Sequence, residues 1–175
     1  VLFRSGAGVF DVSGTSSGAT IVSLTGSSTA TSGVALGGQT LTLSNAGGTY
    51  SGVIGGTGGG LTLSAGTETL SGANTYTGAT TINGGTLALS GSGSIASSSG
   101  VTSSGAGVFD VSGTSSGATI VSLTGSSTAT SGVALGAKTL TLSNAGGTYS
   151  GKMGDRKSTR LNSSHSSVSR MPSSA

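Results

Sequence analysis

The chain has 175 residues, yet it contains no cysteine, no tryptophan, one proline and few aromatic side chains. The absence of cysteine excludes disulfide bonds and thiolate metal sites. Charged residues make up only 6% of the chain. Because Val, Ile and Leu recur in short clusters and charge is sparse, the composition differs from that of most disordered chains, which are rich in charge. We therefore predict a folded body.

The net charge of +3 comes from the two ends of the chain. Between residues 6 and 154 only Lys138 and Lys152 stand against Asp11, Glu68 and Asp110, which leaves a net charge near −1. No basic patch is present in this body, so nucleic acid is excluded as an expected partner.

A long passage is written twice. Residues 6–52 and 105–151 differ at only two of 47 positions at an offset of 99 residues, where Gly38 and Gln39 are replaced by Ala137 and Lys138. Between the copies lies a central segment, residues 61–95. Near-identical copies at a fixed offset are typical of an array of stacked units.

The ends differ from this body. Residues 1–5 and 155–175 resemble translated sequencing adapters, and they hold the single proline, the single histidine and every arginine. The second copy stops following the first at Asp155, where the first has Gly56. We therefore expect residues 1–5 not to be native, residues 155–175 to form a disordered tail, and residues 6–154 to form the folded region, as a fragment of a longer protein.

Short alternating clusters predict strands throughout the body. Residues 40–44 read Thr-Leu-Thr-Leu-Ser, the period of a strand with one buried face. No window keeps the helical spacing of apolar residues over two turns. Turns rich in Gly and Asn separate the clusters, which lie too close together for helical crossovers. An antiparallel sandwich and a solenoid both remain possible on this pattern.

The near-exact repeat, the small aliphatic side chains and the scarcity of charge favour the solenoid. At roughly 20 residues per coil, the 99-residue unit would be about five coils and the body about seven, a rod of about 35 Å. Stacked Asn45, Asn74 and Asn83 could satisfy backbone groups at the corners as an asparagine ladder.

The central segment resembles a known repeat. Its motif SGANTYTGATTINGGTLALSG is similar to the autotransporter-associated β-strand repeat of Gram-negative bacteria, and the flanking copies resemble the passages that link such repeats. The segment departs from the pattern at Glu68, where an apolar or small residue is expected. The resemblance implies an all-β fold, a right-handed parallel β-helix in the passenger of a type V secreted protein.

The resemblance also implies a function. The passenger would be displayed outside the cell, at the outer-membrane surface, as a structural stalk or scaffold, with adhesion, self-association or host-surface contacts as further roles. Its contact with the membrane would be through a β-barrel domain absent from this fragment. No enzyme activity, cofactor, metal or catalytic residue is expected. A Thr-rich ice-binding solenoid and a hydrolase passenger are the alternatives.

Motifs that could carry chemistry are weak. The G-x-S-x-G pattern at Ser16 recurs at Ser115, but a nucleophilic serine needs a histidine base, and residues 6–154 contain none. Residues 146–152 come one residue short of a phosphate-binding loop, because Met153 stands where Ser or Thr is required. We expect both to be structural turns or accidents of composition.

The remaining candidates are also better explained by structure. Asp11 and Asp110 lie 99 residues apart and should point away from the core rather than form a carboxylate pair. Phe10 and Phe109 should fill the core. The ice-binding alternative would need aligned Thr-x-Thr ranks, but the spacing of these pairs predicts that they do not share one face: Thr29 and Thr31, Thr40 and Thr42, Thr67 and Thr69, Thr75 and Thr77.

Overall fold

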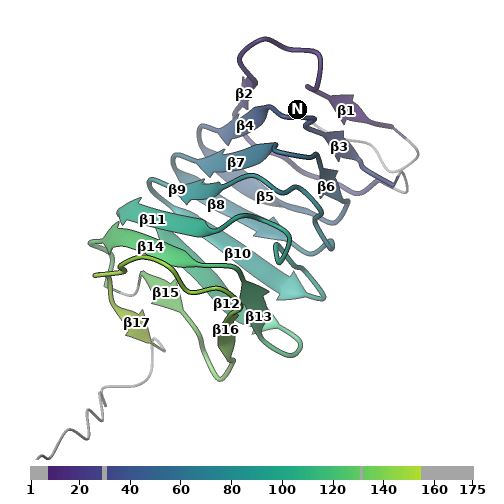
Figure 1. Ribbon diagram of the computed structural model, residues 1–175. Helices are drawn as coiled ribbons and strands as arrows, with labels where there is room; N and C mark the ends of the chain where they lie inside the picture. Colours follow the sequence, from purple (N-terminus) through teal and green to yellow (C-terminus); the bar gives the residue numbers. More distant parts are fainter. Residues whose placement is uncertain (1–7, 29–30, 131, 155–175) are drawn as a thin grey trace, which may run out of the picture.

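A computed structural model describes residues 8–28, 31–130 and 132–154. The expectations for residues 1–5 and for the tail 155–175 lie outside this part of the chain. Within it there are seventeen β-strands and no helix. The strands stack in parallel into a β-solenoid of about seven coils (Figure 1), so the predicted all-β solenoid is confirmed.

Each coil has three sides, and two of them are continuous six-stranded sheets. The first sheet, in spatial order, contains β17 (Met153–Gly154), β15 (Val133–Ala134), β12 (Val108–Thr114), β10 (Thr86–Gly91), β8 (Gly66–Leu70) and β5 (Ala46–Tyr50). The second sheet contains β14 (Leu123–Ser127), β11 (Val101–Gly105), β9 (Thr80–Ile82), β7 (Gly60–Leu63), β4 (Thr40–Leu43) and β2 (Ala19–Ile21).

The third face is made of shorter pieces. One end carries the sheet of β1 (Phe10–Asp11), β3 (Val34–Ala35) and β6 (Ile54–Gly55), and the other end carries β13 (Ala118–Ile120) and β16 (Leu140–Leu142). Between them the chain at Ala73 and Ser94 forms an isolated parallel bridge. Figure 1 shows both pieces on the same side of the rod.

The core forms because alternate residues of every strand point inward. In the second sheet Leu41 pairs with Leu61, and Leu43 pairs with Leu63, which in turn pairs with Ile82. All five side chains are fully buried. Burial of each such side chain contributes about 1.5–3 kcal/mol, so stacked apolar columns stabilise the rod along its length.

Glycines turn the corners where a side chain could not fit. Gly66 and Gly85 both have positive φ, at 80° and 74°. A Cβ on Gly66 would collide with the backbone of Ala46 in the preceding coil, and one on Gly85 would collide with the backbone of Gly66. The coils can therefore stack closely at this corner only with glycine in these positions.

The coils are unequal in length. Phe10 pairs with Val34, which is 24 residues further on, whereas Leu61 pairs with Thr80 after only 19 residues. The 99-residue offset is therefore close to the predicted five coils, but it is not a whole number of coils. It spans four coils and two of the three sides, because Phe10 lies in the third-face sheet whereas Phe109 pairs with Leu87 in the first sheet.

The prediction of an asparagine ladder is wrong, because the three asparagines do not stack on one another. Asn45 and Asn83 lie exposed just after β4 and β9, and Ser64 occupies the same corner in the coil between them. Asn74 lies on a different side and is buried. Its side chain accepts a hydrogen bond from the Ile54 amide (2.9 Å) and donates to the carbonyl of Ser94 (3.0 Å), so one asparagine joins three coils.

Candidate functional site

The two G-x-S-x-G serines lie in exposed turns. Ser16 and Ser115 have no histidine near them within the described residues, since the single histidine is His165. The final glycine of each motif, Gly18 or Gly117, has positive φ and packs against the backbone of the following coil. The motif therefore forms a turn, and the structure brings no base to either hydroxyl.

Residues 146–152 form no phosphate-binding loop. The segment is irregular, it leads into β17, and no helix follows it within residues 132–154. A phosphate site of this type needs the positive end of a helix. This arrangement provides none.

The two aspartates point outward, as predicted, and lie on different sides of the rod. Asp11 is on β1 and Asp110 is on β12. Each carboxylate accepts a hydrogen bond from a backbone amide two residues on, that of Ser13 or Ser112, at 2.8 Å. The bonds from Ser13 lower the pKa of Asp11. Both carboxylates thus stabilise a local turn.

The aromatic side chains turn inward. Phe109, Tyr50 and Tyr76 are fully buried, and Phe10 and Tyr149 are half-buried against the core. The prediction that phenylalanines fill the core is confirmed for Phe109 and holds in part for Phe10. These rings fill the interior, and they present no row of stacking platforms for carbohydrate.

The Thr-x-Thr pairs lie on different sides, as predicted. Thr40 and Thr42 lie in the second sheet, Thr67 and Thr69 in the first, and Thr75 and Thr77 on the third face, while Thr29 lies outside the described residues. The register does align one outward column: Thr20, Thr42, Thr62, Thr81, Thr102 and Thr124. A second rank does not accompany it, since Thr40 pairs with Gly60.

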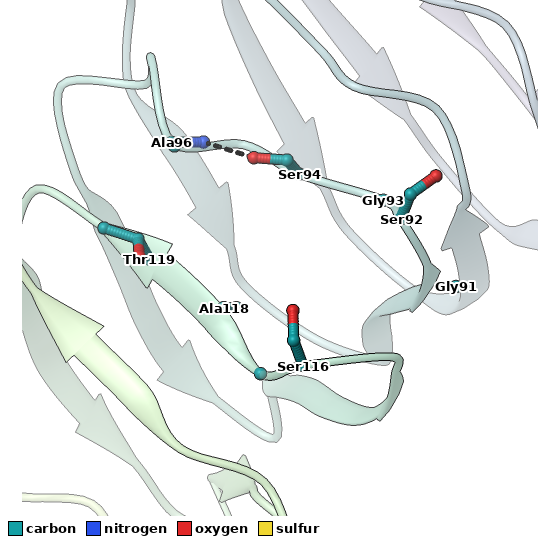
Figure 2. A pocket seen from close by; sticks show the side chains of 9 residues that line it. Gly91, Ser92, Gly93, Ser94, Ala96, Ser116, Ala118 and Thr119 are labelled. Atoms are coloured by element: carbon teal, nitrogen blue, oxygen red, sulfur yellow. Dashed lines mark hydrogen bonds between the residues drawn. The ribbon is translucent and has the colours of Figure 1, made fainter.

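One cleft opens where the third face is interrupted. Its volume is about 250 Å³, and it lies between the chain at Gly91–Ala96 and the start of β13, as Figure 2 shows. The amide of Ala118 donates to the Thr139 carbonyl (3.0 Å) on the far side of β13. Within the described chain, no backbone hydrogen bond connects β13 to residues 92–96 on the other side.

Equivalent strands of the two copies lie on different sides of the rod, and this difference explains the cleft. In the first copy, β2 lies in the second sheet and pairs with β4, whereas its equivalent β13 lies on the third face. There it meets the turn-rich chain around Ser94 instead of a strand. The hydroxyl groups of Ser92, Ser94, Ser116 and Thr119 and the backbone line the cleft, and no titratable side chain does. It can donate and accept hydrogen bonds, but it holds no acid, base or activated nucleophile.

Buried polar groups inside the rod differ in how they are paired. Three hydroxyls form a hydrogen-bonded chain: Tyr76 Oη lies 2.7 Å from Thr80 Oγ1, which lies 2.9 Å from Ser98 Oγ. Burial raises the pKa of Tyr76. Glu68 differs, because it is fully buried and neither carboxylate oxygen has a hydrogen-bond partner. Burial raises the pKa of Glu68 to about 8, against a smaller opposing effect of the Leu24 backbone, which does not reach hydrogen-bond geometry.

Glu68 is the residue whose buried position was not predicted from the sequence. The resemblance to the repeat marks its position as a departure, but it does not predict that the side chain points inward. A signal for that direction is present, because Glu68 and Leu70 alternate with Thr67 and Thr69, which places the carboxyl group on the core side of β8.

Other common sites are absent from the part of the chain that the structure describes. Within it no group of three or more His, Asp or Glu side chains could hold a metal ion. Its residues include no helix with the length and apolar character needed to cross a membrane.

The fold and these sites define a class of protein, a parallel β-solenoid built from stacked repeats. Residues 63–89 match the model of the passenger-associated-transport-repeat family. No curated protein and no solved structure matches the chain. The matched segment falls within the central segment that resembles the autotransporter repeat. Together, this match and the β-solenoid fit the passenger domain of an autotransporter with repeats. Such a repeat implies a secreted, surface-exposed protein.

Proposed function

We propose that the chain is a structural stalk at the outer-membrane surface of a Gram-negative cell, and that it carries no catalytic activity of its own. The observation that supports this most is the continuous apolar column through the matched repeat, from Leu43 to Leu63 to Ile82. Each coil buries its core only against its neighbours. Such an array gains stability coil by coil as it emerges, which suits a rod that folds outside the cell.

Surface display tests the stalk. The full chain is fused to the N-terminus of an outer-membrane barrel domain, and its appearance at the cell surface is followed by added protease. We expect a protected, folded rod at the surface. Leu63→Asp introduces a charge into the core and should abolish that protection, whereas Thr62→Asp, on the outward side of the same strand, should keep it. Equal behaviour of the two variants would contradict the proposal.

Self-association is the finer part of this proposal. Apolar side chains are exposed in the terminal coils of the described chain, with Val22 61% exposed near the start and Met153 46% exposed near the end. Strand edges that lack a neighbour pair readily with other chains. A second copy could therefore stack end to end on the rod, with host-surface contacts as the competing role.

Sedimentation of the purified chain tests this association. We expect the sedimentation coefficient to rise with concentration, and Val22→Lys to reduce that rise, because an edge lysine opposes strand pairing. Val9→Lys, at another exposed apolar position of the first coil, provides a second edge variant. A chain that sediments as a monomer at every concentration would exclude end-to-end stacking while leaving the stalk itself intact.

A further inference from the structure

The side chain of Glu68 lies inside the rod at its middle coils. It belongs to the inward column of the first sheet, where it pairs with Gly48 on one side and with Leu87 on the other. The side chain is 0% exposed. Gly48 has no side chain, and a Cβ added there would collide with Thr25 Cγ2 and approach the Leu24 carbonyl, so the chain of the first coil packs closely against this position.

Apart from the smaller effect of the Leu24 backbone, the interior offers this carboxyl group no group that would stabilise a negative charge. Neither oxygen has a hydrogen-bond partner. The nearest strands and the segment after β2 bury leucine and isoleucine: Leu24, Leu41, Leu43, Leu61, Leu63, Ile82 and Leu87 are all 0% exposed. An isolated charge in such surroundings is so costly that the group changes its protonation state instead.

No charged group faces Glu68 from the described elements packed around it. On β5 the only titratable side chain is Tyr50, and the third face carries Tyr76 and, in the first coil, the outward-pointing Asp11; β10, β4, β7 and β9 contribute none. Burial raises the pKa of both tyrosines, so they are neutral where Glu68 titrates. Asp110, on β12, points outward. The described lysines, Lys138 and Lys152, belong to the last coils.

We propose that folding of the rod takes up one proton from the medium, at Glu68, so that mild acid favours the folded rod over the extended chain. Unfolded, this carboxyl group is solvated and ionised at neutral pH; folded, it is neutral. The proposal does not depend on where the protein acts. If the chain is an exported stalk, the proton comes from the medium into which the chain emerges.

The direction of the pH effect follows from the two protonation states. The ordinary pKa of the glutamate is 4.5, and burial raises the pKa to about 8 in the folded rod. Below the lower value both states carry the proton, and stability is greatest. Between the two values only the folded state carries it, so stability falls as pH rises, by about tenfold in the folding equilibrium constant per pH unit. Above the higher value the effect levels off.

Denaturant unfolding of the full chain across this range tests the proposal. Between about pH 5 and pH 8 the folding equilibrium constant should fall about 400-fold, because the slope flattens near each pKa value. Glu68→Gln, which has the same shape without the charge, and Glu68→Leu should remove most of that slope. Asp110→Asn removes an exposed carboxylate and should keep it. A slope equal in wild type and both Glu68 variants would overturn the proposal.

A second measurement needs no variant. Refolding the wild-type chain by dilution in a weakly buffered solution near pH 7, with a pH-sensitive dye, should show uptake of about one proton per chain. Proton uptake at Glu68 should fall to about a quarter of a proton near pH 4, because most unfolded chains already carry this proton there. Refolding at neutral pH without proton uptake would contradict the inference even if the Glu68 variants failed to fold.

Discussion

The two copies place almost the same sequence at opposite ends of one rod. In the first copy Leu41 and Tyr50 are fully buried, because the central repeat stacks on them, while Phe10 is only half-buried. In the second copy the order is reversed. Phe109 is fully buried beneath the central repeat, and Leu140 is half-buried. Burial in this protein therefore depends on the neighbouring coil as much as on the residue itself.

The comparison also explains why the strands of the two copies differ. Residues 46–50 form strand β5, which pairs with β8, whereas the equivalent residues 145–149 have only an isolated bridge between Gly125 and Tyr149. Local propensity is the same in both places. A strand forms along the whole segment only where a neighbour accepts its hydrogen bonds, which is the behaviour of a one-dimensional array.

The largest expected effect comes from the two equivalent phenylalanines. Phe109→Ala should lower the free energy of unfolding by about 3–5 kcal/mol, because the ring is fully buried between coils. Phe10→Ala removes the same ring from the first coil and should cost clearly less. Denaturant unfolding of both variants measures the difference. Equal losses would show that the coil before a strand does not determine the contribution of its core residue.

Much of this architecture could be predicted from the sequence, because alternation and turn residues are local signals. Strands such as residues 40–43, the inward phenylalanine at 109 and the approximate number of coils follow from them. The side of the rod on which each strand of the second copy lies could not be predicted. It depends on summed coil lengths, which vary between 19 and 24 residues as the turns change.

The candidate sites divide in the same way. The absence of a base for Ser16 and Ser115 could be read from composition alone, and so could the outward direction of Asp11 from its strand pattern. The cleft beside Ser94 could not, because it arises from a mismatch in phase between the central repeat and the second copy. Long-range packing, rather than any local motif, creates that feature.

A smaller loss of stability is expected at a second pair of equivalent residues, where the buried member belongs to the first copy. Leu41→Ala opens a cavity in a fully buried column and should cost about 2–5 kcal/mol. Leu140→Ala, at the equivalent half-buried position, should cost less than Leu41→Ala when both are measured by denaturant unfolding. Together with the phenylalanine pair, this result would invert the ranking of the copies. If the first copy proved more tolerant at both positions, the copies would differ in overall stability instead of in their neighbours.

The smallest effect concerns one of the two positions at which the copies differ. Lys138 donates a hydrogen bond from Nζ to the Ser115 carbonyl at 3.0 Å, on the surface of the rod. Its equivalent in the first copy is Gln39. Lys138→Gln should change the free energy of unfolding by about 0.5 kcal/mol or less, since surface contacts of this kind are weak. Thermal unfolding checks this, with Gln39→Lys as the matched reverse exchange. A large loss from Lys138→Gln alone would mean that sequence, and not only position, distinguishes the two copies.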